Sequence, residues 1–369
     1  MKTIIVNGAN GYVASNFINN LLKQKYKVIA LVRANKGLSP EERMEKVLVD
    51  IKDNENVDTT NLQVYGYSLL DDNFSIEEND LKTIFHTDVD YFHFAASLKY
   101  DEKSVGEIFS TNVEGVKNSV KVFSKYATTA SRFFYIGTAY SCGKHNGVFE
   151  EKFYNDEDIL AFRNYYEQSK RFAENIINEN IRKNGLKGHI IRLSQVVGNK
   201  QTGVTKTDYG IFDFSKRMYN LAKRYPNTTV RVRVFPEATQ NLIAIDTVLS
   251  YLMKTVEVEQ LPVIMNFVAK NSTKNKHIID GLNKLLPINI IPLEKLDKKE
   301  MNSMERLISV GMSFTGSYVN TNIKFDTKRR DEFIASSNGE IDKNTIFKML
   351  EYFIDSLSEN KKKQKSNAA

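Results

Sequence analysis

The stretch that decides the fold is residues 3–22, which read TIIVNGANGYVASNFINNLL. Its first four residues are apolar or β-branched, as in a buried strand, and a turn with two glycines follows them. The apolar residues after the turn recur at the spacing of one helix face: Phe17, Ile18, Leu21 and Leu22. A strand, a glycine turn and a helix in this order are typical of the first unit of a dinucleotide-binding fold.

The turn itself is the candidate phosphate site. Gly8 permits a tight turn, and Gly11 lets backbone N–H groups approach a pyrophosphate at the positive end of the helix. Ala14 stands at the third glycine position, where a small residue still allows the helix to pack on the strand. Purely structural glycine turns are common, but the place of this one between a strand and a helix favours nucleotide binding. The residues expected to contact the cofactor here are Gly8, Asn10, Gly11, Tyr12 and Val13.

Short apolar runs alternate with helical stretches through the first half of the chain. The later runs are residues 28–32 (VIALV), 62–65 (LQVY), 91–94 (YFHF), 133–136 (FFYI) and 189–191 (HII). Buried strands separated by helices indicate a parallel sheet that is covered on both faces. We therefore predict an α/β fold, a doubly wound parallel Rossmann sheet with a smaller C-terminal substrate lobe.

The rhythm changes after residue 197, where the segments become longer and more irregular. We predict an NADP-binding core over residues 1–197, with later strands from about 240–270, and a substrate-binding lobe with a C-terminal helix over most of 198–358. That helix has an apolar stripe, formed by Ile346, Met349, Leu350, Phe353, Ile354 and Leu357. The lysine-rich residues 359–369 are expected to form a basic, disordered tail, with weak contact to a membrane surface as the alternative.

Composition narrows the class of protein. The 369 residues are 41% hydrophobic and 26% charged, an ordinary globular balance. The single cysteine, Cys142, excludes a disulfide framework and a Cys-rich metal site, so we predict no metal. We see no signal peptide and no long apolar run, and we expect a cytoplasmic chain without a transmembrane segment. The formal charge of +7 suits an anionic cofactor or substrate, but it is scattered, and we predict no nucleic-acid partner.

The end of the second strand bears on the choice between NAD and NADP. NAD-binding sheets usually place an acidic residue there, whereas this chain has Arg33, with Lys36 shortly after it. A guanidinium binds a 2′-phosphate through two parallel hydrogen bonds, and Lys36 adds positive charge. We therefore predict NADPH as the cofactor. The alternative is that Arg33 is a surface arginine without a ligand.

The candidate catalytic groups are Thr138, Tyr166 and Lys170. Tyr166 and Lys170 have the spacing that places two side chains on one helix face, where an ammonium is expected to lower the pKa of the phenol. Tyr166 then becomes a general acid, whereas Tyr165 has the wrong offset. Thr138 follows the strand at 133–136 and is expected to orient a substrate carbonyl in the ligand crevice. Its alternative role is a hydrogen bond to the backbone at the strand end.

Four further segments carry a family resemblance. They are residues 93–102 (HFAASLKYDE), 112–115 (NVEG), 137–143 (GTAYSCG) and 190–198 (IIRLSQVVG). Through them the chain resembles the extended short-chain dehydrogenases/reductases, and within these the male-sterility-type branch of fatty acyl-CoA reductases and carrier-protein thioester reductases. The resemblance covers roughly residues 1–270.

The resemblance implies roles for individual residues. Tyr166 would be the proton donor, Lys170 would bond the nicotinamide ribose, and Thr138 would bind the reacting oxygen. The residues implied in cofactor binding or relay are Gly8, Gly11, Arg33, Ser68, Leu69, Ala95, Ala96, Asn112 and Lys170. Two positions depart from the family pattern: Gly137 replaces a serine, and Ser68 replaces the acid expected near the adenine. His93 we interpret as structural.

Three classes of function remain open. The first is reduction of an acyl thioester, on coenzyme A or a carrier protein, by NADPH to an aldehyde or an alcohol. The second is a related carbonyl reductase, epimerase or dehydratase, including enzymes that act on nucleotide-sugars. The third is a regulator that binds a dinucleotide without catalysis, which an intact Thr138, Tyr166 and Lys170 set disfavours. The sequence leaves monomer and homodimer both open.

One apolar stretch of the predicted lobe bears on the substrate. It contains Met301, Met304, Leu307, Ile308, Met312 and Phe314. Methionine adapts to irregular apolar ligands, so the stretch could line an acyl tunnel, although ordinary core is the favoured interpretation.

Overall fold

The computed structural model describes residues 2–35, 37–51, 58–311, 315–334 and 341–366. The chain divides into two compact units, each assembled from three segments. The first unit comprises residues 1–193, 249–267 and 326–335, and the second comprises 194–248, 268–325 and 336–369. The return of residues 326–335 to the first unit was not predicted, and the predicted domain boundaries stay a prediction.

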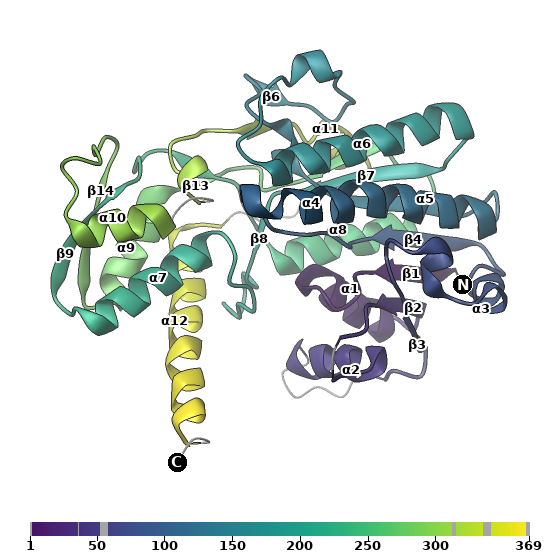
Figure 1. Ribbon diagram of the computed structural model, residues 1–369, viewed down its shortest axis with the longest axis horizontal. Coiled ribbons are helices and arrows are strands. Elements are labelled where there is room, and N and C mark those ends of the chain that lie inside the picture. The colour runs from purple at the N-terminus through teal and green to yellow at the C-terminus, as the bar shows by residue number, and fades with distance from the viewer. Residues whose placement is uncertain (1, 36, 52–57, 312–314, 335–340, 367–369) are drawn as a thin grey trace. The chain divides into compact units, whose positions relative to one another are not determined.

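A seven-stranded sheet, in which all neighbouring strands pair parallel, forms the centre of the first unit (Figure 1). In spatial order its strands are β12 (Ile264–Phe267), β7 (Gly188–Leu193), β5 (Arg132–Thr138), β4 (Val89–His93), β1 (Thr3–Asn7), β2 (Lys27–Val32) and β3 (Leu62–Gly66). This order confirms the predicted doubly wound parallel sheet. The chain changes direction between β1 and β4, and ligands of such sheets bind at this switch point, beside the carboxyl ends of the strands.

Helices cover both faces of this sheet. One face packs on α3 (Glu78–Ile84), α5 (Gly115–Tyr126) and α6 (Tyr165–Asn184), which share a continuous apolar cluster with the strands. On the other face, Phe17 of α1 (Tyr12–Lys23) lies 4.9 Å from Phe92 between ring centroids. Tyr251 of α8 (Ile245–Glu257) lies 5.2 Å from Phe267 by the same measure. Because both faces are covered, the central strands are buried and mostly apolar, with single polar residues such as Asn7 of β1 and His93 of β4.

Smaller elements complete the first unit. Helix α2 (Pro40–Ile51) follows β2, and α4 (Val105–Phe109) runs through a π-helical turn, Ser110–Glu114, into α5. The remaining elements are β6 (Val148–Phe149), α11 (Lys328–Phe333) and 3₁₀ turns at Asp72–Ser75, Glu102–Ser104, Ala139–Cys142 and Asp156–Asp158. A π-helical turn inside a helix is uncommon and often marks a functional site.

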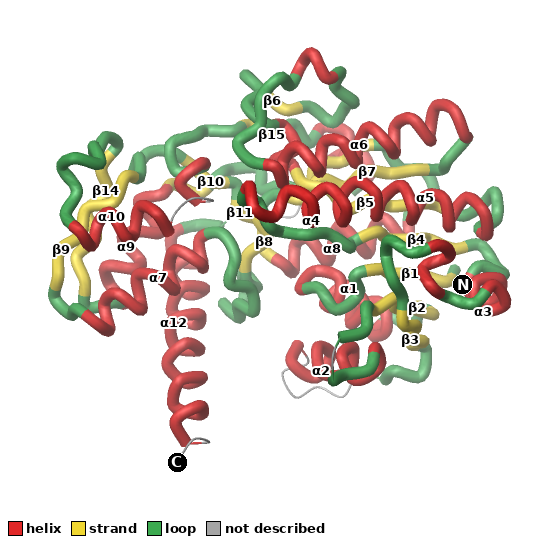
Figure 2. Tube along the Cα trace, in the orientation of Figure 1, coloured by secondary structure: helices red, strands yellow, loops and turns green. Residues whose placement is uncertain are grey.

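The described residues of the second unit form helices and short strand pairs (Figure 2). Its helices are α7 (Ile211–Arg224), α9 (Asn275–Leu285), α10 (Ser303–Gly311) and α12 (Lys343–Ser366). Its strand pairs are β8 (Gln195–Val197) with β11 (Leu242–Ala244), β9 (Thr228–Arg233) with β14 (Ile288–Leu293), and β10 (Thr239–Gln240) with β13 (Thr273–Lys274). Strand β15 (Lys324–Phe325) also belongs to this unit.

The predicted stripe of α12 packs into the apolar core of the second unit, together with residues of α7 and α9. The helix continues through Ser366, where the sequence analysis placed a disordered tail from residue 359. The residues at this end include glutamate, lysine and glutamine, which are good helix formers, so the helix extends although the segment carries many like charges. Residues 367–369 lie outside the description. No described helix has the length and the apolar character needed to cross a membrane.

Candidate active site

The turn that is predicted to bind phosphate begins at Gly8, directly after β1. Its φ of +60° lies in the left-handed region, and a Cβ added there would stand 2.8 Å from the Ala95 nitrogen. Only glycine fits this close approach of two backbones. Gly11 precedes α1 without a side-chain cap, and the first turn of α1 contains no acidic residue. The positive end of the helix dipole at this point favours an anion.

The other predicted residues of the turn follow in order. Asn10 lies between the two glycines, and Tyr12 and Val13 are the first residues of α1, all three being half-buried. Ala95 and Ala96 follow β4, and Ala95 faces Gly8 across the switch point. The structure thus brings the predicted phosphate turn and the segment after β4 together.

A buried asparagine that the sequence analysis missed holds these two segments in place. The side-chain oxygen of Asn7 accepts hydrogen bonds from the backbone nitrogens of Phe94 (2.8 Å) and Ala95 (3.0 Å). Its side-chain nitrogen lies 3.0 Å from the Tyr91 hydroxyl and 2.9 Å from Nδ1 of His93. An asparagine inside an otherwise apolar strand, TIIVN, was the available signal.

His93 is structural, as its surroundings show. Its ring is fully buried, and burial lowers its pKa to about 3, so it stays neutral. Because the Asn7 nitrogen donates toward it, Nδ1 is an acceptor, and it also contacts the Ser119 hydroxyl at 3.0 Å.

The loop after β3 holds a second missed residue, Tyr67. Its buried hydroxyl accepts a hydrogen bond from the Gly8 nitrogen at 3.2 Å, and burial raises its pKa to about 12. Ser68, which was predicted to contact the cofactor, makes hydrogen bonds within its own loop. Its backbone nitrogen donates to the Phe74 oxygen, and the hydrogen bond of its hydroxyl to Asp71 lowers the pKa of that carboxyl. Leu69 packs beside Gly115, where a Cβ would come within 2.6 Å of the leucine.

Two arginines lie near the end of β2: Arg33 directly follows the strand, and Arg43 belongs to α2. Arg33 is exposed, and its charge acts on the Tyr67 hydroxyl and on Glu107, which places it near the phosphate turn. Arg43 of α2 donates a hydrogen bond to the Arg33 carbonyl oxygen, so a second guanidinium stands close to this strand end. Sequence reasoning missed Arg43, because only the packing of α2 brings it there. The predicted Lys36 lies outside the described residues.

Thr138, Tyr166 and Lys170 come together at the end of β5. Thr138 is the last residue of the strand, and its hydroxyl accepts from the Tyr140 nitrogen and donates to the Leu193 oxygen, both at 3.2 Å. Tyr166 lies in the first turn of α6, and its phenol hydrogen bonds with Thr138. Thr138 thus makes the alternative hydrogen bond to the backbone at the strand end, and its hydroxyl also lies beside the Tyr166 phenol.

Helix α6 begins at a fixed point, which sets the position of Tyr166. The Asn164 side chain caps the helix by accepting from the Glu167 nitrogen at 2.9 Å. Glu167 in turn accepts from the Arg163 nitrogen at 2.8 Å, and its carboxylate is buried against the Arg163 guanidinium. This capping holds the first turn, and with it the phenol, beside β5.

Lys170 is buried one turn after Tyr166. Its ammonium donates to the Ile136 oxygen at 3.2 Å and lies 6.0 Å from the Tyr166 ring centroid. Burial lowers the pKa of Lys170 to about 8, which leaves it mostly protonated at pH 7. Burial raises the pKa of Tyr166, against a smaller lowering by its hydrogen bond with Thr138. The expected lowering of the phenol pKa by Lys170 is therefore wrong for this structure, because desolvation outweighs an ammonium that is directed at a carbonyl.

Asn112 lies in the π-helical turn and is almost fully buried. Its side-chain oxygen accepts from the Ser97 nitrogen at 2.7 Å, and its nitrogen donates to the Ser97 oxygen and to the Ser169 hydroxyl. Ser169 donates to the Tyr166 carbonyl oxygen at 2.9 Å. Asn112 thus ties the segment after β4 to the helix turn that carries Tyr166 and Lys170.

The buried carboxylate of Glu174, on α6, accepts hydrogen bonds from several side chains near this site. Arg192 donates to it at 3.0 and 2.8 Å, Arg171 at 3.0 Å and the Ser141 hydroxyl at 2.8 Å. These cations hold the pKa of Glu174 below its usual range although burial opposes them. Because Ser141 lies in the turn that follows Thr138, the cluster also fixes that turn. The neighbouring Cys142 is buried, which raises the pKa of its thiol to about 12 and leaves it inert.

A phosphate-binding turn, a strand-end threonine and a Tyr/Lys pair on one doubly wound sheet define an NAD(P)-binding oxidoreductase. The class is that of the extended short-chain dehydrogenases/reductases. A family model described as male sterility protein matches residues 6–251. The chain belongs to this family, as its motifs predicted.

The curated proteins that match this chain in sequence are distant relatives. Fatty acyl-CoA reductase 8 of Arabidopsis thaliana is 26% identical over 175 residues, covering 43% of this chain and 35% of the plant protein. An oxidoreductase of Saccharomyces cerevisiae is 26% identical over 185 residues, covering 47% of this chain and 50% of the yeast protein. The chain therefore spans half or less of the curated relatives that it matches.

Solved structures share the fold over nearly the whole chain. The terminal R domain of the myxalamid PKS-NRPS pathway superposes with a TM-score of 0.75 at 15% identity, covering 96% of this chain and 91% of that one. A thiolation-reductase di-domain of an archaeal non-ribosomal peptide synthetase gives 0.73 at 17%, covering 97% and 76%. UDP-glucuronic acid 4-epimerase of Bacillus cereus gives 0.65 at 16%, covering 96% and 99%.

Proposed function

We propose that this chain is an NADPH-dependent reductase of an acyl thioester carried by coenzyme A or by a carrier protein. The observation that carries the proposal is the Thr138, Tyr166 and Lys170 cluster beside the Gly8 turn. The acceptor is inferred from the family and from relatives named as fatty acyl-CoA and thiolation-linked reductases.

Residues of the first unit fit a dinucleotide. The open N-terminus of α1 and the glycine-lined approach at Gly8 suit a pyrophosphate. Arg33, with Arg43 beside it, suits the 2′-phosphate that distinguishes NADPH from NADH. When bound, the nicotinamide supplies the hydride.

The residues of this chain supply orientation and the proton. A carbonyl oxygen placed at the hydroxyls of Thr138 and Tyr166 would accept a hydrogen bond from Tyr166, and a second from Thr138 once its proton turns away from the Leu193 oxygen; these bonds polarise the carbonyl carbon. Tyr166 keeps its proton at neutral pH because burial raises its pKa, so it can donate that proton to the oxygen. The Lys170 ammonium, charged at pH 7, stabilises the negative charge that develops nearby. Once the carbonyl carbon carries the hydride, the resulting hydroxyl would return its proton to the Tyr166 phenolate as the carbon–sulfur bond breaks, which would give the aldehyde and a thiolate.

A carbonyl reductase or a nucleotide-sugar epimerase is the second candidate, and the epimerase likeness in fold supports it. The closer fold agreement with the two reductase structures supports the first candidate. Arg33 also argues against an enzyme that retains NAD, since a cation rather than an acid stands at the end of β2.

The test is oxidation of NADPH, followed by absorbance, with a panel of acyl-CoA thioesters, acyl carrier thioesters, aldehydes, ketones and UDP-sugars. We expect turnover with thioesters, and loss of at least about 100-fold in kcat for Tyr166→Phe. Turnover with ketones or UDP-sugars but with no thioester refutes the proposed acceptor. Product analysis in the same assay distinguishes aldehyde from alcohol.

Cofactor preference is tested separately with Arg33→Ser. The variant is expected to bind NADPH at least about tenfold more weakly while NADH binding changes little, because a charge-assisted bond to phosphate is lost. Arg182→Ser, an exposed arginine on α6, is the control. Equal weakening of both cofactors by Arg33→Ser refutes the assignment.

A further inference from the structure

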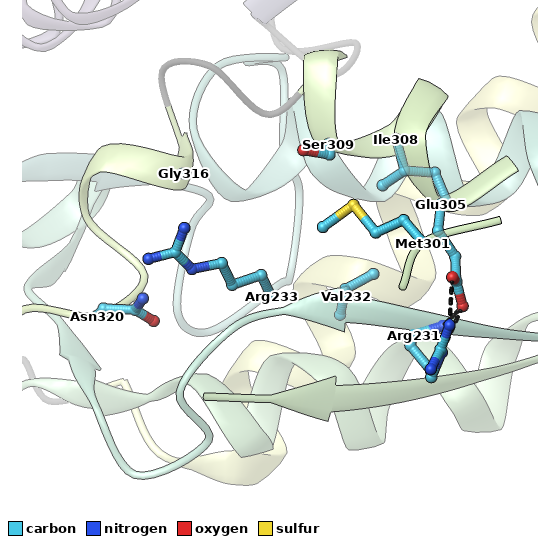
Figure 3. Close-up of a pocket in the computed structure, with 9 residues that line it drawn as sticks. All are labelled: Arg231, Val232, Arg233, Met301, Glu305, Ile308, Ser309, Gly316 and Asn320. Atoms are coloured by element: carbon cyan, nitrogen blue, oxygen red, sulfur yellow. Dashed lines mark hydrogen bonds and ion pairs between the residues drawn. The ribbon is translucent and has the colours of Figure 1, made fainter. Parts of the chain in front are cut away.

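The second unit contains a cavity of about 270 Å³ between β9 and α10 (Figure 3). Its lining has three apolar side chains, Val232, Met301 and Ile308, and five polar ones, together with Gly316; the polar side chains are Arg231, Arg233, Glu305, Ser309 and Asn320. All of them belong to the second unit, so the cavity is independent of the Thr138 cluster.

The apolar part of the cavity is buried. Val232, Met301 and Ile308 are between 2% and 7% exposed, and they come from β9, from the segment before α10 and from α10 itself. Figure 3 shows the Arg233 guanidinium and the Met301 thioether on either side of the space, between Val232 and Ser309. A ligand in this space would therefore meet apolar atoms on one side and hydrogen-bond donors on the other.

Three of the polar side chains, those of Arg233, Ser309 and Asn320, carry groups that can donate a hydrogen bond to an anion. Within the described part of the chain, the structure gives no hydrogen bond or ion pair to the Arg233 guanidinium, the Ser309 hydroxyl or the Asn320 amide nitrogen. The Asn320 oxygen accepts from the Phe235 nitrogen at 3.0 Å, which fixes the amide with its nitrogen free. An exposed guanidinium with two neutral donors is a receptor for a small anion.

The other two charged side chains of the cavity, Arg231 and Glu305, neutralise each other. Glu305 accepts two hydrogen bonds from the Arg231 guanidinium, at 2.8 Å each, and a third from the Asn302 nitrogen at 2.9 Å. The bonds from Arg231 hold the pKa of Glu305 at about 2, so this pair is ionic and internally neutral near pH 7. Arg233 therefore leaves the cavity with one net positive charge.

We propose that this cavity binds a small organic anion, a carboxylate or phosphate ester attached to a short apolar group. The anion lies against Arg233, Ser309 and Asn320, and the apolar group contacts Met301 and Ile308. The volume is just under the range of about 300–1,000 Å³ that drug-sized ligands occupy, so the ligand is compact and a long acyl chain does not fit inside it.

The nine methionines of the chain provide a local readout. The full-length chain is labelled with ¹³C-methyl methionine, and the Met301 signal is assigned by its loss in Met301→Leu. Hexanoate and hexyl phosphate are titrated as anionic probes. Hexylamine and 1-hexanol have the same apolar tail without the anion, and acetate has the anion without the tail.

We expect a saturable shift of the Met301 methyl signal with hexanoate or hexyl phosphate, and a clearly weaker effect of the other three probes. Arg233→Gln should weaken binding at least about tenfold, because a hydrogen bond from a charged group is lost. Arg182→Gln, in the first unit, should leave binding unchanged. The other methionine signals show whether each variant keeps its fold.

Three results overturn the proposal. They are the absence of a saturable Met301 shift with both anions, equal binding of hexylamine or hexanol, and unchanged hexanoate binding in Arg233→Gln. If one anion binds and the other does not, the proposal stands and the binding headgroup is identified. Reductase activity plays no part in this readout, so the result does not depend on the proposed function.

Discussion

Replacing Lys170 with methionine is expected to abolish reduction and, at neutral pH, to stabilise the fold. Lys170 is 3% exposed, and its ammonium donates to the Ile136 oxygen at 3.2 Å. Burial lowers its pKa to about 8, so at pH 7 a charge is held where the surroundings disfavour it. Methionine has similar length and no charge, and it leaves Tyr166 without the cation that the proposed mechanism uses.

The magnitude follows from the pKa of about 8 in the folded chain and the ordinary value of 10.5. The unfolded chain holds the proton more tightly, so the charged lysine lowers the free energy of unfolding by roughly 3 kcal/mol at pH 7. This destabilisation is complete below pH 8 and disappears as the pH rises to 10.5, since the folded chain releases its proton first. Losing the donor to Ile136 costs about 1 kcal/mol. The variant should therefore gain about 2 kcal/mol at pH 7 and almost nothing by about pH 10.

Urea unfolding, followed by circular dichroism without cofactor at pH 7 and pH 10, measures this difference. Lys183→Met is the matched control, because Lys183 lies on the same helix but is exposed and paired with Glu179 at 2.7 Å. The control should change stability by less than about 1 kcal/mol at either pH. A Lys170→Met chain that is less stable than the original at pH 7, or equally stabilised at both pH values, refutes the reasoning.

Three further outcomes are expected. Gly8→Ala should lower the free energy of unfolding by more than about 1–2 kcal/mol, which is the cost of placing a non-glycine residue in the left-handed region. The effect should exceed this cost because the Cβ of the new alanine would also stand 2.8 Å from the Ala95 nitrogen. Thermal melts measure the stability of the variant, and NADPH fluorescence measures its cofactor binding. Glu174→Gln should destabilise the fold by about 3–5 kcal/mol in urea titrations, since it leaves two buried arginines without their carboxylate. Cys142 should resist iodoacetamide at pH 8 in the folded chain and react in urea, as mass spectrometry would show, because burial raises its pKa to about 12.

The sequence was sufficient where local pattern determines structure. Apolar runs separated by helical stretches predicted six strands of the sheet in their correct places, and the seventh, β12 (Ile264–Phe267), lies where later strands were expected, at about 240–270. The glycine turn was recognisable because positive φ and backbone contact demand glycine at Gly8. The spacing of Tyr166 and Lys170 was recognisable because a helix converts four residues into one face.

The sequence was insufficient where partners come from distant segments. Asn7, Tyr67 and Arg43 join the site only through contacts with segments that are distant in the sequence, and no local pattern marks these contacts. The pKa of Tyr166 was predicted in the wrong direction for a related reason. Helical spacing shows that an ammonium is near, but the balance between its charge and desolvation depends on burial and on the direction of the Lys170 side chain.

The arrangement of buried charges around α6 explains why the Lys170 ammonium is not paired with Glu174 and stays near Tyr166. Glu174 stands four residues after Lys170, a spacing at which lysine and glutamate commonly pair on a helix. Such a pair would draw the ammonium toward Glu174 and away from Tyr166. Arg171, Arg192 and Ser141 occupy the carboxylate instead, and Lys170 donates to Ile136. Glu174 still raises the pKa of Lys170 from a distance, so the cluster helps keep the ammonium protonated at neutral pH without binding it.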